Sequence, residues 1–222
     1  MAEAEDPTAT DGSLSRDRIL REAVSLADRE GLHALSMRRL ARELDAGAMT
    51  LYHYVTGKDE LLEGMVDLVF GEIEPPTGDG WKSAMRRRCS SARDVLVRHS
   101  WAISLMESLT RPGPANLRHR EAVVACLRGG GFDLRTTVHA NWVLDSYVYG
   151  FALQEVSLPF DTAEELAQIA DDVFIPQVPA DSYPHLHEIA VTLLQTAYEP
   201  GDEFAVGLDL ILDALDLLRS TA

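Results

Sequence analysis

Cysteine is scarce in this chain, whose 222 residues include only Cys89 and Cys126. Two cysteines cannot build the disulfide framework of a small secreted protein, and neither belongs to a CxxC or Cys/His group of the kind that holds structural zinc. The length and the 46% content of hydrophobic residues allow a true hydrophobic core. We therefore expect a folded protein in a reducing, intracellular compartment.

Long apolar runs are missing as well. No stretch approaches the roughly 18 apolar residues that a membrane-spanning helix needs. Residues 1–13 are acidic and have neither the basic start nor the apolar core of a signal peptide, and they show no apolar period. The sequence thus predicts a soluble, cytoplasmic protein that begins with a disordered tail and has no membrane partner.

Positive charge is in deficit, since 20 Lys and Arg face 36 Asp and Glu for a net charge of -16. A chain with that charge spread evenly should be repelled by nucleic acid. The charge is uneven, however: residues 1–13 carry -4, residues 14–58 carry +2 and residues 59–222 carry -14. This pattern predicts a small module that faces a polyanion, joined to an acidic body. A mildly basic solvated face is the alternative explanation.

Convincing strand patterns are absent, and apolar residues recur at the three- and four-residue spacing of helices. Ser15 begins an amphipathic helix that Gly31 ends, and Ser36 begins a short second helix that Asp45-Ala46-Gly47 breaks. Thr56 to Asp59 matches the Ser/Thr-x-x-Asp/Glu signature of a capped N-terminus. We predict an all-α fold class, with helices near residues 15–30, 36–44, 48–55, 58–74, 79–98, 100–110, 114–129, 133–156, 161–174, 184–198 and 202–219.

The predicted helix at 48–55 is too short to be stable alone, so it must pack on its neighbours through Leu51 and Val55. Two short helices joined by a turn that contains Gly47 match the helix-turn-helix, whose second helix enters the major groove of DNA. An ordinary helical hairpin is the alternative. The side that faces outward has small groups, hydroxyls and aromatic rings but no Asp, Glu, Lys or Arg, namely Ala48, Met49, Thr50, Tyr52, His53 and Tyr54.

Three cations flank this segment. Arg38 and Arg39 lie in the first turn of the helix capped by Ser36, where the helix dipole disfavours positive charge, so we expect an anion nearby. Lys58 lies at the start of the next helix, where free backbone N–H groups can hold a phosphate. We expect these groups to grip the DNA backbone while the exposed helix reads bases. A solvated surface cation is the alternative for each one alone.

The segment from Ser15 to about Phe70 resembles the DNA-binding domain of the TetR family of repressors, above all in the runs LSMRRLAREL (35–44), TLYHYV (50–55) and KDELL (58–62). The resemblance implies that Arg38, Ala48, Met49 and Thr50 approach bases, and that Tyr52, Tyr54 and Lys58 contact phosphates. We predict an acidic tail over residues 1–14, a helix-turn-helix domain over 15–60 and a larger helical domain for ligand binding and dimerisation over 61–222. The predicted DNA-binding residues are Ser36, Arg38, Arg39, Ala48, Met49, Thr50, Tyr52, His53, Tyr54 and Lys58.

The last predicted helix has an apolar arc that is wider than a single seam, so it needs two sets of neighbours. We predict that one set belongs to a second copy of the chain, and that the long helix at 133–156 shares this interface; an interior helix is the alternative. Such a dimer would bind a palindromic operator of double-stranded DNA with half-sites about 34–36 Å apart. The predicted dimer interface is Val138, Val148, Phe151, Phe204, Leu208, Ile211, Leu215 and Leu218.

Large adaptable side chains with a few polar groups lie in the middle of the chain. They suit a small-molecule cavity between helices, with ordinary core packing as the alternative. TetR regulators have such a cavity, and residues 109–112 and 131–135 resemble parts of the tetracycline-repressor branch, namely the loop that shifts with inducer and the start of the dimerising helix. The predicted ligand-binding residues are Trp81, Met85, Trp101, Met106, Arg111, His139, Trp142, Asp145 and Tyr149.

The chain departs from that branch at two points. Glu107 stands where the branch has its metal-chelating histidine, and Gln154-Glu155 stands near the branch's later acidic pair. We therefore expect a small-molecule inducer other than magnesium-tetracycline, largely apolar or aromatic, and we expect no metal and no cofactor.

Two other classes of function are open to such a chain. His185 and His187 are two residues apart, so on a helix they diverge by about 200° and do not match a zinc-protease pair. No nucleophile elbow or phosphate-binding glycine loop is visible, so we predict no catalytic residues and no enzyme. An all-α enzyme remains the alternative from another class, and an acidic protein-interaction module without DNA binding is a third.

Overall fold

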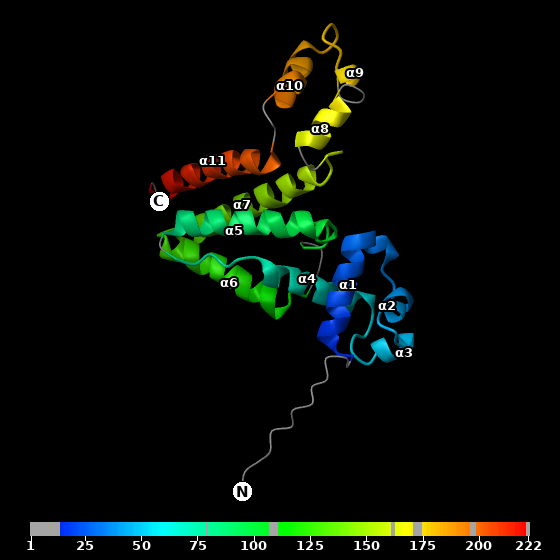
Figure 1. The fold of residues 1–222 in the computed structure, drawn as a ribbon. Coiled ribbons are helices and arrows are strands. Elements are labelled where there is room, and N and C mark those ends of the chain that lie inside the picture. The colour runs from blue at the N-terminus through cyan, green and yellow to red at the C-terminus, as the bar shows by residue number, and fades with distance from the viewer. Residues whose placement is uncertain are drawn as a thin grey trace. The chain divides into compact units, whose positions relative to one another are not determined.

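The computed structural model describes residues 14–78, 80–106, 111–160, 163–170, 175–195 and 199–220. Within these ranges the chain consists of helices joined by turns and contains no strand, which confirms the all-α fold class (Figure 1). Its helices are α1 (Arg16–Glu30), η1 (Leu32–Ala34), α2 (Met37–Glu43), α3 (Ala48–Leu51), α4 (Lys58–Glu72), α5 (Trp81–Arg98), η2 (Ser100–Ala102), α6 (Pro114–Gly129), α7 (Leu134–Glu155), α8 (Ala163–Ile169), α9 (Ile175–Gln177), α10 (Pro184–Gln195) and α11 (Pro200–Ser220).

The helix starts follow local side-chain chemistry. Three helices are preceded by a residue with an extended backbone, namely Ser15, Ser36 and Asp133. The side chain of each accepts a hydrogen bond from a backbone N–H in the first turn of its helix. These bonds to Arg18, Arg39 and Thr136 confirm the predicted starts of α1, α2 and α7.

Three expected elements differ from the structure. The predicted helix at 48–55 is α-helical only to Leu51. Beyond it, turns form through hydrogen bonds between residues three positions apart, such as Tyr54 N–H to the Leu51 carbonyl (3.0 Å). The predicted helix at 100–110 contains only the short η2 followed by turns to Met106, and its residues 107–110 lie outside the described ranges. The predicted helix at 161–174 is described only as α8, with residues 161–162 and 171–174 outside those ranges.

The chain forms two compact units, which we call unit 1 (Met1–Glu74 and Arg98–Glu121) and unit 2 (Pro75–Val97 and Ala122–Ala222). The predicted boundary at residue 60 falls inside α4, which lies whole in unit 1. Unit 1 therefore contains α1, η1, α2, α3, α4, η2 and the first half of α6.

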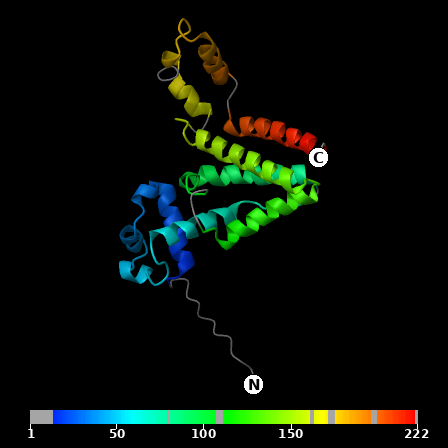
Figure 2. The same ribbon diagram turned by 180° about the vertical axis from the view of Figure 1, so that it is seen from behind.

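Unit 1 is held together by the packing of α1 against α4 (Figure 2). Gly64 on α4 allows the close approach, since a Cβ there would lie 2.6 Å from a methyl group of Leu20 on α1. Arg16 and Glu60 form an ion pair of 3.5 Å at the start of the two helices. Leu40, Leu51 and other fully buried side chains join α2 and α3 to the same core. This core holds α3 in place, although a helix that short has little stability of its own.

Unit 2 is built around α5, α7 and α11, of which α7 and α11 lie side by side (Figure 1). Tyr147 and Phe151 of α7 pack on Phe204 of α11, with ring centroids 5.2–5.8 Å apart. The Tyr147 hydroxyl also donates to the Phe204 carbonyl at 3.0 Å. This core contains a charged pair, in which Arg88 Nη1 of α5 lies 2.8 Å from Asp145 Oδ1 of α7.

Candidate nucleic-acid interface

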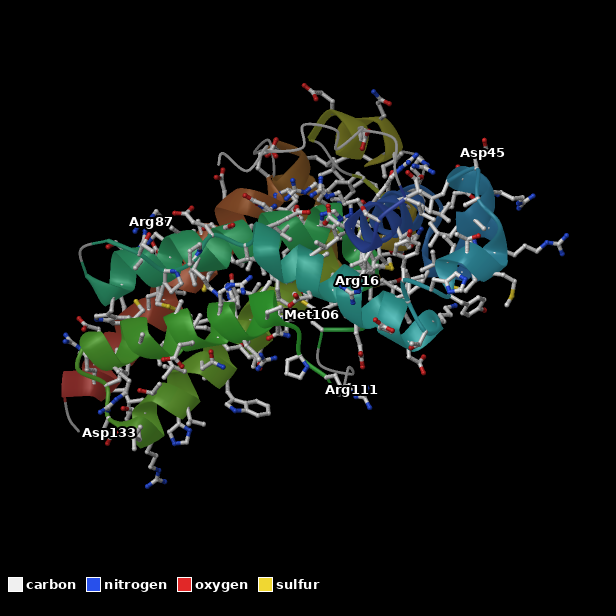
Figure 3. The ribbon with its side chains drawn as sticks, turned by 90° about the horizontal axis from the view of Figure 1, so that it is seen from below. Arg16, Asp45, Arg87, Met106, Arg111 and Asp133 are labelled. Atoms are coloured by element: carbon white, nitrogen blue, oxygen red, sulfur yellow. The ribbon has the colours of Figure 1, made fainter. Side chains whose placement is uncertain are left out.

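The turn between α2 and α3 sets the direction of α3. Asp45 takes a left-handed conformation (φ 50°), which Asp tolerates better than most residues, and it lies at the outer end of this region (Figure 3). Ala46 N–H then donates to the Ala41 carbonyl at 2.9 Å, and Gly47, in extended conformation, precedes α3. The left-handed position of the turn is therefore at Asp45, with Gly47 two residues later as the cap of α3.

Helix α3 has one buried side and one exposed side. Leu51 is fully buried, as is Val55 just beyond the helix, which confirms that this segment is anchored through those two side chains. Met49 is 76% exposed, and Thr50, Tyr52, His53 and Tyr54 are exposed as well. Residues 46–58 contain no Asp or Glu, so this stretch itself carries no negative side chain.

The flanking cations are not equivalent. Arg38 and Lys58 are exposed and have no ion pair with the part of the chain that the structure describes. Arg39 instead donates from Nε to Glu43 and from Nη2 to Glu30, both at 2.8 Å. The hydrogen bond that Arg39 donates to Glu43 and the negative charge of Glu30 raise the pKa of Arg39. The anion expected near Arg39 is therefore supplied by α1 and α2 of the same chain.

The start of α4 differs from the predicted capping box. Gly57, not Thr56, is the residue before the helix, and the carboxylate of Glu60 accepts bonds from both the N–H and the hydroxyl of Thr56 at 2.8 Å. These bonds lower the pKa of Glu60. The signature was thus shifted by one residue, and Glu60 rather than Asp59 completes it. The bonds between Glu60 and Thr56 fix the chain between α3 and Lys58.

The predicted ligand-binding residues of unit 1 fall into two places. Trp101 is buried, and its indole N–H donates to Oδ1 of Asp28 at 2.6 Å. Met106 and Arg111 line a cavity of about 240 Å3 beside α4 and the start of α6 (Figure 3). The other side chains of this cavity are Glu63, Val66, Asp67, Pro112, Gly113, Asn116 and Arg120.

Those of unit 2 lie on different sides of the helices. Trp81 packs edge-on against Phe132 with centroids 4.7 Å apart, Met85 is fully buried, and Tyr149 is half-buried. Asp145 is engaged with Arg88. His139 and Trp142 instead lie on the outside of α7, where Trp142 is 70% exposed. The structure therefore separates these two from the core residues.

The predicted dimer residues are also divided. Four of them are buried inside the chain itself and have no free surface for a partner, namely Val148, Phe204, Leu208 and Leu215. Phe151 and Ile211 are half-buried. Only Val138 and Leu218 are exposed. The apolar spacing along α7 and α11 therefore marks mainly the faces that these helices bury within the chain.

Sequence reasoning missed three buried or bonded polar groups. Arg88 follows Trp81 by seven residues and Met85 by three, so the helical period places it on the core face and could have revealed it. Asp67 bonds to the start of α6, and His99 lies between two carboxylates; both contacts join segments distant in sequence. No local signal marks such pairs.

The geometry is that of a helix-turn-helix protein with a second, larger helical part. Residues 19–65 match the model for "Bacterial regulatory proteins, tetR family", and residues 74–218 match the model for "Tetracyclin repressor-like, C-terminal domain". The chain belongs to the TetR family, and its function class is that of a ligand-responsive transcriptional repressor.

Individual relatives agree with this assignment. The HTH-type transcriptional repressor DrrR1 of Streptomyces coeruleorubidus is 34% identical over 93% of this chain and 78% of its own length. Apo ActR of Streptomyces coelicolor has a TM-score of 0.75 at 29% identity, covering 98% of this chain and 99% of that one. The structure of ActR in complex with actinorhodin has a TM-score of 0.74 at 30% identity, and the match covers 94% of this chain and 96% of that one.

Among the described residues, no helix is long and apolar enough to cross a membrane. The same residues contain no group of three or more His, Cys, Asp and Glu side chains placed to hold a metal ion.

Proposed function

We propose that this repressor binds a palindromic DNA operator as a dimer, with α3 in the major groove, and that a largely apolar or aromatic small molecule releases it. The observation that carries the proposal is the exposed, acid-free face of α3, held by a buried Leu51. Because the rest of the chain is acidic, such a face next to Lys58 and Arg38 suits a polyanion and little else. Binding to DNA would place the protein in the cytoplasm.

The exposed groups suggest a division of roles. Ala48 and Met49 are apolar, which suits contact with thymine methyl groups, and Thr50 can bond to a base edge. Tyr52, Tyr54, His53 and Lys58 lie farther along the same stretch and suit phosphate contacts. Ser36 and Arg39 act indirectly in this scheme, because one caps α2 and the other joins α2 to α1.

The dimer interface that we propose uses the outer faces of α7 and α11. Val206, Leu210 and Leu217 of α11 are each at least 60% exposed and recur at helical spacing, and Val138 and Trp142 are exposed on α7. Five large apolar side chains on two helices that pack side by side need a cover. A second copy is the cover that would also supply a second α3 for a palindrome.

Replacing Leu210 by Lys should therefore convert the dimer to a monomer. A charged group at the centre of an apolar interface is left without a partner, so we expect at least about a tenfold rise in the dimer dissociation constant. Sedimentation equilibrium over a range of concentrations measures it. Leu186→Lys on α10, also exposed, is the matched control and should dimerise normally. An undiminished Leu210→Lys dimer would refute this interface.

The cavity beside Met106 and Arg111 lies where a ligand would affect α4. Asp67 of α4 accepts bonds from the backbone N–H groups of Ala115 (3.2 Å) and Asn116 (2.8 Å) in the first turn of α6. Gly113 permits this contact, since a Cβ there would lie 2.2 Å from the Asp67 carboxyl carbon. Asp67 thus caps α6 from another helix. A ligand that moves the start of α6 would pull on α4, which begins at Lys58 on the DNA-binding side.

Asp67→Ala should uncouple ligand binding from operator release. We expect the ratio of operator Kd with and without ligand to shrink by about tenfold, because the bonded link from α6 to α4 is lost. The ligand is an apolar or aromatic compound found by a thermal-shift screen, and release is followed by fluorescence anisotropy of labelled operator. Asp67→Asn keeps one of the two acceptor oxygens and should retain part of the response. Equal responses in Asp67→Ala and the unmodified protein would contradict the coupling route, and a screen without any stabilising compound would contradict the ligand class.

A further inference from the structure

A buried imidazole lies in unit 1, away from the proposed DNA-binding face. His99 is 5% exposed and follows directly after α5 in the chain. Its Nδ1 lies 2.8 Å from Oδ1 of Asp28 near the end of α1, and its Nε2 lies 3.2 Å from Oε2 of Glu72 at the end of α4. The ring thus stands between the carboxylates of two helices. We call His99, Asp28 and Glu72 the His99 bridge.

The chemistry of the bridge depends on a proton. A neutral imidazole has one N–H donor and one bare nitrogen, whereas an ionised carboxylate only accepts. Both ring nitrogens of His99 can therefore donate to Asp28 and Glu72 only when the ring is an imidazolium. The neutral ring would leave one bare nitrogen against a carboxylate oxygen, which is repulsive.

Other charged and polar groups surround the two carboxylates. The Trp101 indole donates to the same oxygen of Asp28, and Arg98 forms an ion pair of 3.2 Å with Glu72. Arg21 of α1, Asp67 of α4 and Arg118 of α6 line one groove together with Asp28 and Glu72. The indole N–H and the Arg98 guanidinium thus share with the His99 ring the carboxylate oxygens that would accept from an imidazolium.

The position of the bridge explains what it can control. At their starts, α1 and α4 are joined by Arg16 and Glu60, and the bridge joins the same two helices twelve residues later at their ends. Helix α1 packs on α2, while α4 begins at Lys58. We propose that His99, as an imidazolium, is a positioning residue for operator binding: it fixes the ends of α1 and α4 and so the placement of α3 relative to Lys58. The inference rests on the proposed operator contacts.

The sign of the pH effect follows from the geometry. Loss of the proton removes one of the two bonds and weakens the arrangement that binds DNA, so operator affinity should fall as pH rises. A second histidine, His53, is exposed on the DNA-binding face and suits phosphate contact. A test must therefore separate His99 from His53.

The test is operator Kd at pH 6 and pH 8 and constant salt, for the full-length protein, His99→Gln and His53→Gln. The DNA is a duplex selected from a random library. We expect the affinity of the unmodified protein and of His53→Gln to fall about tenfold between the two pH values, as for the loss of one charge-assisted bond. Because a glutamine amide donates equally at both pH values, the operator affinity of His99→Gln should change much less between them. A His99→Gln ratio equal to that of the unmodified protein overturns the proposal.

A second variant covers a failure of His99→Gln to fold. Glu72→Gln places an amide against the ring, which can pair with a neutral imidazole, so the pH ratio should again shrink. If Glu72→Gln shows the same ratio of operator Kd at pH 8 and pH 6 as the unmodified protein, the role of the His99 bridge is overturned. The proposed operator binding is not affected by that result. Failure of the unmodified protein to enrich any duplex from the library overturns both the bridge and the proposed function.

Discussion

Met49→Glu should abolish specific operator binding, with a rise in Kd of at least about 100-fold, or roughly 2.7 kcal/mol. Met49 is 76% exposed on α3, in a stretch of the chain from residue 46 to residue 58 that has no acidic residue. A carboxylate at this position would lie against base edges and close to phosphates, where it loses water and meets like charge. It would also remove an apolar contact suited to a thymine methyl group.

Fluorescence anisotropy with a labelled operator measures this effect. Because Met49 contributes little to the core, the melting temperature should stay within about 2 °C of that of the unmodified protein. Ala125→Glu adds the same charge at an exposed position of α6 and is the matched control, expected to bind normally. If Met49→Glu bound the operator as tightly as this control, α3 would not be the element that reads DNA.

Arg88→Met should destabilise the protein by about 3–5 kcal/mol, which is the usual cost of removing one partner of a buried ion pair. Arg88 is nearly fully buried, and its guanidinium lies 2.8 Å from the Asp145 carboxylate. Burial alone would lower the pKa of Arg88, but attraction to Asp145, with smaller contributions from Cys89 and Tyr149, outweighs it and the pKa is raised. Without Arg88, Asp145 still accepts the weaker bond from Asn141 at 3.2 Å.

Urea denaturation at a fixed protein concentration measures this loss, since dimer stability depends on concentration. The double variant Arg88→Met with Asp145→Leu removes both charges and should recover most of the stability. The control is Arg86→Met, because Arg86 is exposed on another face of α5. This change should alter the free energy of unfolding by less than about 1 kcal/mol. A single variant as stable as the double variant would show that the pair is not a structural element of unit 2.

Local sequence signals predicted much of the fold. Ser15, Ser36 and Asp133 have the side chains that cap helices, and each does so. Apolar spacing located the long helices to within a few residues, because a buried stripe is required wherever a helix covers a core. The errors fall at short elements such as α3 and η2, where bonds to the third residue replace regular helix and the apolar period is too brief to show it.

Contacts between distant residues could not be predicted in the same way. The anion expected near Arg39 was a DNA phosphate, and the sequence did not indicate that Glu30 of α1 would lie there instead. The bonds of Asp67 and His99 likewise join residues about 50 and 70 positions apart. Such pairs depend on how helices cross, which periodicity does not specify.

Apolar spacing also fails to distinguish a core from an interface. Leu208 and Leu210 both lie in apolar positions of α11, yet one is fully buried within the chain and the other is 68% exposed. Both faces are hydrophobic because both are covered in the proposed assembly, one by α7 and one by a second copy. Only the position of α7 beside α11 shows which face is free.

Selection from a random duplex DNA library by the full-length protein, followed by sequencing, tests the central claim most directly. A dimer that presents two copies of α3 should enrich a two-fold symmetric motif with half-sites about one helical turn, 10–10.5 base pairs, apart. Met49→Glu selected in parallel should enrich nothing. Absence of any enriched motif with the unmodified protein, or enrichment of a single unpaired half-site, would contradict the account.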